Sequence, residues 1–276
     1  MPRRLRLDAE LVRRGLARSR DHAAELVAAG RVKVGGAVAR KPATGVGTDA
    51  AIVVLDDPER PDYVSRGGHK LAGALAAFSG LQVAGRRCLD AGASTGGFTD
   101  VLLRNGAREV VAVDVGYGQL AWPVRQDSRV RVHERTNVRA LEADAVGGPV
   151  DLVVGDLSFI SLTRVLEALT AMTVPDGDLV LMVKPQFEVG KERVGKGGVV
   201  RDPGLRSEAV RTVADAAARL GWGAQQVATS PLPGPSGNVE FFLWLRRADA
   251  RLTPAQIEAE VLRGSAAGEP DEKVGP

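Results

Sequence analysis

The chain has 276 residues, of which 44% are hydrophobic and 26% charged, with a formal net charge of +3. This is an ordinary globular composition, and no window holds the ~18 uninterrupted apolar residues of a membrane-spanning helix. One cysteine excludes an internal disulfide, and three histidines with one cysteine disfavour a zinc site. We therefore expect a cytoplasmic protein of two domains that binds no metal, with Cys88, in the apolar run RRCLDAG, as a buried structural thiol.

The charge is concentrated at the N-terminal end. Residues 1–41 carry eleven Lys or Arg against four acidic residues, a balance of +7, so the remainder sums to −4. Such an asymmetry favours a polyanionic partner, although a solvated polar face explains a run of charge equally well.

The first 55 residues predict two short helices and a small sheet. The segment LDAELVRRG predicts a helix that ends at Gly15, and SRDHAAELVAAG predicts a second helix between the N-cap Ser19 and Gly30. Apolar and basic residues then alternate around GG in RVKVGGAVAR, which is typical of a hairpin, and AIVVLD predicts a further strand.

In order and spacing, residues 6–46 resemble the small RNA-binding module named after ribosomal protein S4. The resemblance implies that basic side chains of this module, with one just beyond the linker, contact RNA phosphates and position the protein in a salt-dependent way. The residues concerned are Arg4, Arg6, Arg14, Arg18, Arg20, Lys41 and Arg66. With 4% aromatic residues, the sequence shows no base-stacking platform.

Residues 56–64 are polar, contain two prolines and predict a linker. Over residues 65–250, apolar runs alternate with amphipathic segments, which is typical of an α/β fold with a mostly parallel, doubly wound sheet. The strands are expected in RRCLDAG, EVVAVDVG, VRVHERTN, DLVVGDLS, DLVLMVKP, QQVATSP and EFFLWLR. Residues 251–276 are expected to form a C-terminal tail with a frayed end, SAAGEPDEKVGP.

A glycine-rich turn follows the first of these strands, in LDAGASTGGFTD. It lacks the lysine of a P-loop and the spacing of G-x-G-x-x-G, which disfavours ATP and dinucleotides. Asp114, about twenty residues beyond, ends the next strand, where an acid can accept both hydroxyls of a ribose. A structural glycine turn is the alternative.

The pattern D-x-G-x-x-x-G followed by that acid resembles the S-adenosylmethionine site of Rossmann-like methyltransferases. Asn137, after the third strand, is expected near the adenine or in a turn. The residues implied for the cofactor are Asp90, Gly92, Ala93, Ser94, Thr95, Gly96, Gly97, Phe98, Asp114 and Asn137.

Lys184 ends the apolar run LVLMV in a chain with thirty arginines and seven lysines. An ammonium can lose its proton when it is desolvated, whereas a guanidinium cannot, although a lysine at a strand end can also simply reach solvent. Asp156 is expected at the same crevice, Glu240 at the start of the last strand, and Lys70 on the approach to the domain's first helix. Together these four residues resemble the K-D-K-E tetrad of FtsJ/RrmJ-type ribose 2'-O-methyltransferases, in which Lys184 would accept the hydroxyl proton or stabilise the alkoxide.

Almost end to end, the chain resembles the TlyA family, also named haemolysin A-like. The motifs are VSRGGHKL, DAGASTGGFTD, DVGYGQL, ERTN, DLSFISL, VKPQFEVG and PSGNVEFFLWL. The resemblance implies a Rossmann-like class I methyltransferase domain, with seven strands and the last one antiparallel, behind a small α+β RNA-binding domain. It also implies 2'-O-methylation of cytidine in small- and large-subunit ribosomal RNA with S-adenosyl-L-methionine.

Two other functions stay open from the residues. A non-catalytic RNA-binding or assembly factor would keep this fold and bind RNA without methyl transfer. A membrane-lytic haemolysin would need a lytic amphipathic segment, and the most amphipathic stretch, PGLRSEAVRTVADAAARLG, has the small apolar face of a helix that packs on a sheet.

Overall fold

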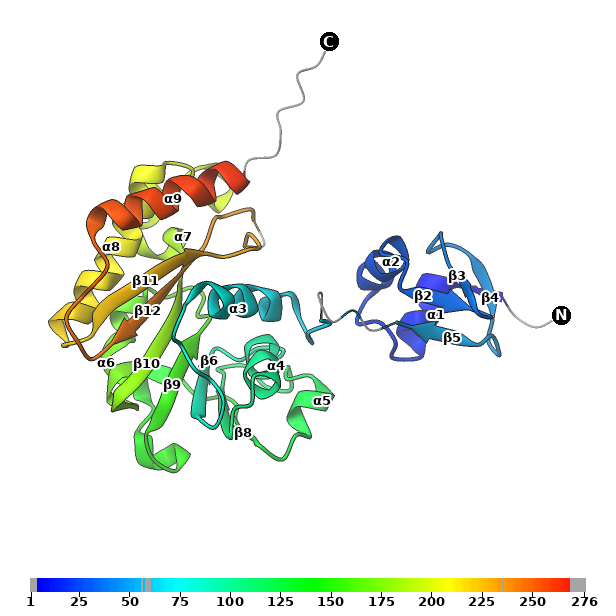
Figure 1. Ribbon diagram of the computed structural model, residues 1–276, viewed down its shortest axis with the longest axis horizontal. Helices are drawn as coiled ribbons and strands as arrows, with labels where there is room; N and C mark the ends of the chain where they lie inside the picture. The colour runs from blue at the N-terminus through cyan, green and yellow to red at the C-terminus, as the bar shows by residue number, and fades with distance from the viewer. Residues whose placement is uncertain (1–3, 56, 58–60, 235, 269–276) are drawn as a thin grey trace, which may run out of the picture. The chain divides into compact units, whose positions relative to one another are not determined.

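The computed structural model describes residues 4–55, 57, 61–234 and 236–268 and divides into two compact units, Met1–Asp62 and Tyr63–Pro276 (Figure 1). The predicted linker, residues 56–64, ends two residues beyond the boundary between the units, which lies between Asp62 and Tyr63. Tyr63 is buried in the second unit, and the Val64 amide donates a hydrogen bond of 2.9 Å to Asp100. These two residues therefore belong to the packed domain, because their apolar side chains and backbone are bound there.

The first unit is a small α+β fold. Its helices are α1 (Leu7–Arg13) and α2 (Arg20–Ala28), and its strands are β1 (Arg4–Arg6), β2 (Val32–Val34), β3 (Ala37–Val38), β4 (Gly45–Gly47) and β5 (Ile52–Val54). Strand β2 lies between β3 and β5, while β1 pairs with β4, all antiparallel. As predicted, the Ser19 hydroxyl caps α2 by accepting from the His22 amide. Leu7, Leu11 and Leu26 fill the core between helices and sheet.

The second unit is built on a seven-stranded sheet in the order β11-β12-β10-β9-β6-β7-β8. The strands are β6 (Arg87–Ala91), β7 (Glu109–Val113), β8 (Val130–His133), β9 (Val150–Gly155), β10 (Thr173–Val183), β11 (Gly223–Thr229) and β12 (Phe241–Arg246). Strands β10, β9, β6, β7 and β8 pair in parallel, whereas β12 is antiparallel to both β10 and β11. The expected Rossmann-like sheet with an antiparallel last strand is confirmed.

Helices cover both faces of this sheet (Figure 1). One face packs against α3 (Arg66–Ala77), α4 (Gly97–Arg104) and α5 (Trp122–Arg125), and the other against α6 (Leu166–Ala171), α8 (Pro203–Arg219) and α9 (Pro254–Gly268). Successive side chains of a strand point to opposite faces of the sheet. Cys88 therefore packs in the core on the side of α3, α4 and α5, and Leu89 packs in the core on the side of α6, α8 and α9. Burial raises the pKa of the Cys88 thiol to about 12, as expected for a structural cysteine.

The predicted C-terminal tail, residues 251–276, contains helix α9. Helix α9 buries Ile257 and Val261, which lie one turn apart on the face that packs against α8 and β11. Ser265, inside the segment expected to fray, accepts a 2.5 Å hydrogen bond from the buried Arg206. The expectation for residues 269–276 lies outside the described residues. Among the helices that the structure describes, none is long and apolar enough to cross a bilayer.

Candidate active site

The candidate site lies at the edge of the sheet where the parallel strands end. The register pairs Ala91 with both Val113 and Gly155, so β6, β7 and β9 end at the same level. Val183, the last residue of β10, pairs with Phe241, the first residue of β12. The residues that follow the parallel strands and the one that precedes β12 therefore meet along one edge, as expected for this topology.

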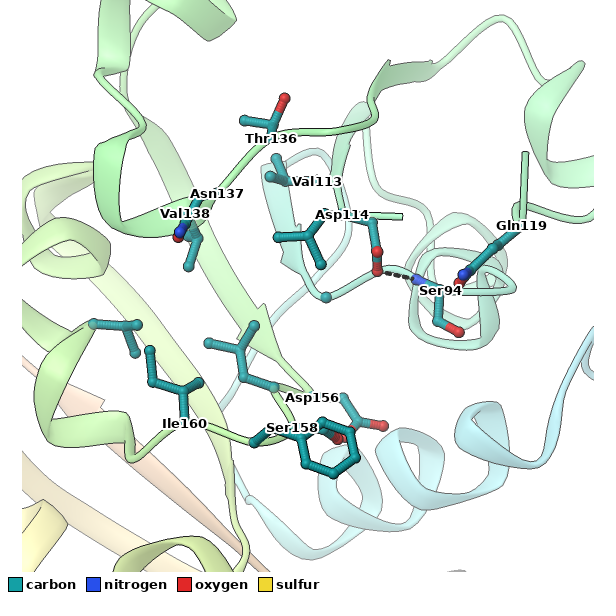
Figure 2. Close-up of a pocket in the computed structure, with 15 residues that line it drawn as sticks. Ser94, Val113, Asp114, Gln119, Thr136, Asn137, Val138, Asp156, Ser158 and Ile160 are labelled. Carbon is teal, nitrogen blue, oxygen red and sulfur yellow. Dashed lines mark hydrogen bonds between the residues drawn. The ribbon is translucent and has the colours of Figure 1, made fainter. Parts of the chain in front are cut away.

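A cavity of about 450 Å³ opens at this edge and is shown in Figure 2. Five residues predicted from the sequence line it: Gly92, Ser94, Asp114, Asn137 and Asp156. Residues that the sequence did not single out complete the lining, among them Gln119, Thr136, Ser158, Phe159 and Ile160. The volume is in the range of ligand pockets for small organic molecules.

The carboxylate of Asp114 is fixed at one wall of the cavity. Its Oδ2 accepts from the Ser94 amide at 2.8 Å, the bond drawn in Figure 2, and its Oδ1 accepts from the Gly116 amide at 2.7 Å. Each bond holds one carboxylate oxygen, and each oxygen keeps a further lone pair for a ligand hydroxyl. This arrangement suits an acid that binds the ribose of a nucleoside.

Gly92 gives the glycine-rich turn its shape. Its φ of 86° lies in the left-handed region, and a Cβ atom there would come within 2.8 Å of the Asp156 carbonyl oxygen. The turn after β6 can therefore lie directly against the segment after β9. This close approach keeps the two walls of the cavity together.

Several residues predicted for the cofactor have other surroundings in the structure. Gly97 allows α3 and α4 to pack closely, since a Cβ atom there would lie 2.2 Å from Ser65 Oγ. Phe98 is buried, with its ring 5.9 Å from that of Phe242 in the core. The residues of the predicted set that do not line the cavity are Asp90, Ala93, Thr95, Gly96, Gly97 and Phe98. For these, a cofactor contact stays a prediction.

Asp90 is fully buried beneath the glycine-rich turn. Its Oδ2 accepts a 2.6 Å hydrogen bond from the Thr99 hydroxyl, while its buried Oδ1 has no hydrogen-bond partner among the described residues. Burial raises the pKa of this carboxyl to about 7, with a smaller contribution from the negative charge of Asp156 and an opposing one from Thr99.

The four residues of the predicted catalytic tetrad form two ion pairs. Lys184 Nζ lies 2.6 Å from Asp156 Oδ1, and Lys70 Nζ lies 2.6 Å from Glu240 Oε2. The Lys184–Asp156 contact is a charge contact without the alignment of a hydrogen bond, whereas Lys70 donates a hydrogen bond to Glu240. The register of β10 and β12 places Lys184 and Glu240 beside each other, so the two pairs occupy neighbouring positions at the edge.

Both lysine side chains are only 9% exposed, and Glu240 is almost completely buried. A buried ion pair holds its partners firmly, since removing one partner leaves an uncompensated charge. The tetrad is therefore a preorganised set of charges rather than a set of solvated surface residues.

Two further side chains act on this edge and were missed in the sequence. Ser158 accepts a 2.7 Å hydrogen bond from Lys184 Nζ. Glu188, in α7 (Pro185–Glu188), accepts from the Ser161 hydroxyl at 2.6 Å and from the Leu162 amide at 2.9 Å, and burial raises its pKa. Neither residue belongs to a periodic sequence pattern. Each is recognised as part of the site only because the fold brings it close to the tetrad.

The cavity fits S-adenosyl-L-methionine by its chemistry. An acid fixed at the end of β7 suits a ribose, and Val115, Val138 and Ile160 offer apolar surface for an adenine ring. The turn after β6 brings backbone close to the ligand space without side chains in the way at Gly92.

The basic residues of the first unit differ in how they are held. Arg6 and Arg20 are more than half exposed and share Asp8, whose pKa their hydrogen bonds and charges hold well below its usual range. Arg14 instead binds Glu10 and the carbonyl oxygens of Ala50 and Thr48. Arg4, Arg18 and Lys41 are exposed in this unit, and Arg66 is exposed on α3 of the other. Arg14 thus has a structural role in addition to the predicted RNA contact.

Comparison with known proteins gives matches to both units. Residues 63–247 match the FtsJ-like methyltransferase family, and residues 5–52 match the S4 domain. The 16S/23S rRNA (cytidine-2'-O)-methyltransferase TlyA of Mycobacterium tuberculosis is 61% identical over 269 residues, which cover 97% of this chain and 100% of the relative. Hemolysin A of Brachyspira hyodysenteriae is 35% identical over 86% of this chain and 98% of its own length.

A solved structure shows a similarity in fold as well as in sequence. A Streptococcus thermophilus chain, provisionally named a hemolysin, superposes with a TM-score of 0.72 and 38% identity. The match covers 96% of this chain and 97% of the other. The similarity therefore extends over both units.

Proposed function

Because the chain belongs to the FtsJ-like methyltransferase family and 97% of it aligns with a TlyA enzyme at 61% identity, we propose that it methylates the ribose 2'-hydroxyl of cytidine in ribosomal RNA. The proposed methyl donor is S-adenosyl-L-methionine, and the proposed substrates are small- and large-subunit RNA, free or in ribosomal subunits. The observation that carries the chemistry is the ion pair of the buried Lys184 with the partly exposed Asp156 at the rim of a nucleoside-sized cavity.

Four groups of this chain support donor binding. Asp114 would accept hydrogen bonds from the ribose hydroxyls, Asn137 lies where a contact to the adenine is expected, and Gly92 and Ser94 line the turn beside them. When bound, S-adenosylmethionine supplies an electrophilic methyl group that is transferred to the 2'-oxygen as the carbon–sulfur bond breaks. The other requirements of the reaction fall to the protein.

A ribose hydroxyl is a weak nucleophile at neutral pH, so a nearby group has to accept its proton or stabilise the alkoxide. Lys184 is proposed for that role, because its side chain is only 9% exposed and its nitrogen is held by Asp156. Lys70 adds a like charge at the same edge, and Glu240 balances it. General-base assistance contributes about 10² to 10⁴ in rate, and orientation of the hydroxyl contributes further.

The S4-like unit supports the RNA part of the proposal. Its exposed basic side chains, Arg6 and Arg20 among them, offer phosphate contacts, which position a protein on RNA without reading its sequence. Substrate choice would then combine RNA shape at this unit with the geometry of the methyltransferase cavity.

The experiment measures tritiated methyl transfer to unmodified ribosomal subunits, followed by digestion to nucleosides. Wild-type protein should produce 2'-O-methylcytidine, and Lys184→Ala should lower the rate about 10²-fold or more. Lys196→Ala, which alters an exposed lysine in the following loop, serves as a charge-matched control. Full activity of Lys184→Ala would refute the assigned mechanism. RNA binding by wild-type protein without methyl transfer would favour the binding-factor alternative.

A further inference from the structure

Ser158 both lines the cavity and contacts the Lys184 ammonium. Its hydroxyl accepts from Lys184 Nζ at 2.7 Å, and the residue also lines the cavity. Asp156, two residues earlier in the same segment, lines the cavity as well and contacts the same nitrogen at 2.6 Å. Of the described residues that line the cavity, these two are the ones with a recorded polar contact to Lys184.

The two contacts differ in chemistry. Asp156 stabilises the ammonium by its charge, and its Oδ1 makes no aligned hydrogen bond to the lysine nitrogen. A serine hydroxyl both accepts and donates, and its hydrogen rotates to suit the partner. Ser158 supplies the aligned hydrogen bond: its oxygen accepts an N–H of Lys184, which the ammonium and the neutral amine both have, and this leaves the lone pair of the neutral amine free for the proton of the substrate.

The surrounding backbone holds Ser158 in place. Phe159, the next residue, has a φ of 64° and a side chain that is 91% exposed, and the chain bends at this residue. Three and four residues after Ser158, Ser161 and Leu162 are bound by the partly buried carboxylate of Glu188. Because Glu188 follows Lys184 by one helical turn, the segments that carry the lysine and the serine are tied to each other.

We propose that Ser158 is a positioning residue for methyl transfer, which holds the Lys184 nitrogen in place beside the cavity through their hydrogen bond. The proposal rests on the proposed function, because it assigns the serine a role through Lys184. Ser158 does not bind the methyl donor in this scheme, and its loss should leave donor affinity unchanged.

The test compares wild-type protein with Ser158→Ala, Ser158→Cys and Ser158→Thr. We expect kcat to fall about tenfold to a hundredfold in the Ala and Cys variants, the range given by loss of one hydrogen bond to a charged group. KM for the RNA and the dissociation constant for S-adenosylmethionine should each stay within about twofold. The Thr variant keeps the hydroxyl and should recover most of the lost kcat.

Structural loss can be separated from loss of positioning. Ser158 is exposed, so its truncation should leave the melting temperature unchanged, and Ser79→Ala, another exposed serine, provides the matched control. A kcat of Ser158→Ala within twofold of wild type, or equal kcat values for the Thr and Ala variants, would overturn the role of Ser158 alone. Absence of methyl transfer by wild-type protein would instead refute the proposed function and, with it, this role.

Discussion

Lys70 and Glu240 form a 2.6 Å ion pair between the first helix of the methyltransferase unit and the start of its last strand, 170 residues away in the chain. Both side chains are more than nine-tenths buried. The pair therefore ties α3 to the antiparallel strand β12 at the edge where Lys184 also lies.

Breaking this pair should destabilise the protein. Glu240→Gln leaves the Lys70 ammonium buried without a counter-charge, and Lys70→Met does the same for Glu240, so each should lower the free energy of unfolding by about 3 to 5 kcal/mol. The Lys70→Met/Glu240→Gln double variant should lose less than the two single losses combined. Urea unfolding of all four proteins measures the coupling, and additive losses would contradict it.

Asp114 should govern donor affinity. Asp114→Asn keeps the shape of the side chain but turns one acceptor into a donor facing the Ser94 or Gly116 amide, so the cavity wall should loosen as the ribose contact weakens. We expect S-adenosylmethionine to bind about tenfold to a hundredfold more weakly. Titration calorimetry measures this, with Asp144→Asn at an exposed site as control. Equal affinities would show that Asp114 does not contact the donor.

The buried Asp90 should make stability depend on pH. Its pKa is about 7 in the folded protein against 3.8 as the ordinary value, so the folded state binds the proton more tightly. The contribution of the Asp90 carboxyl to the free energy of unfolding is therefore fully present below about pH 4, and it is lost as the pH rises through 7. In the ligand-free protein, the free energy of unfolding of Asp90→Asn should exceed that of wild type by at most about 4 kcal/mol above pH 7. Near pH 4 the two free energies should be equal.

Urea unfolding of wild type and Asp90→Asn at pH 4 to 8 gives the difference directly. Subtracting one curve from the other removes the titration of groups common to both proteins. A difference that does not change with pH would mean that Asp90 is already ionised in the folded state at low pH.

The basic residues of the S4-like unit should separate into two groups. Lys41→Ala removes an exposed charge, so RNA affinity should fall and the slope of log K against log salt should decrease by about one. Arg14→Ala removes a side chain bonded to Glu10 and two carbonyl oxygens, so it should cost about 1 kcal/mol or more of stability. Filter binding at several salt concentrations, with thermal unfolding, measures both. A lower melting temperature for Lys41→Ala with an unchanged slope would contradict the distinction.

The sequence alone determined the strands and the edge at which the site lies. Apolar runs separated by amphipathic segments identified all seven strands of the sheet. A buried strand shows as a short apolar run in the sequence itself, so it can be recognised without knowing which strands lie beside it. The position of Lys184 immediately after such a run placed it at the carboxyl edge, and the register confirms that position.

Only the tertiary structure decided which groups meet there. The partners of Lys70 and Lys184, the hydroxyl of Ser158 and the tight packing at Gly97 depend on strand register and on how helices lie over the sheet. Helix α9 likewise packs against α8 and β11, two elements that its own sequence does not identify. Such contacts join residues far apart in the chain, so no local pattern carries them, and they appear when the whole sheet has folded.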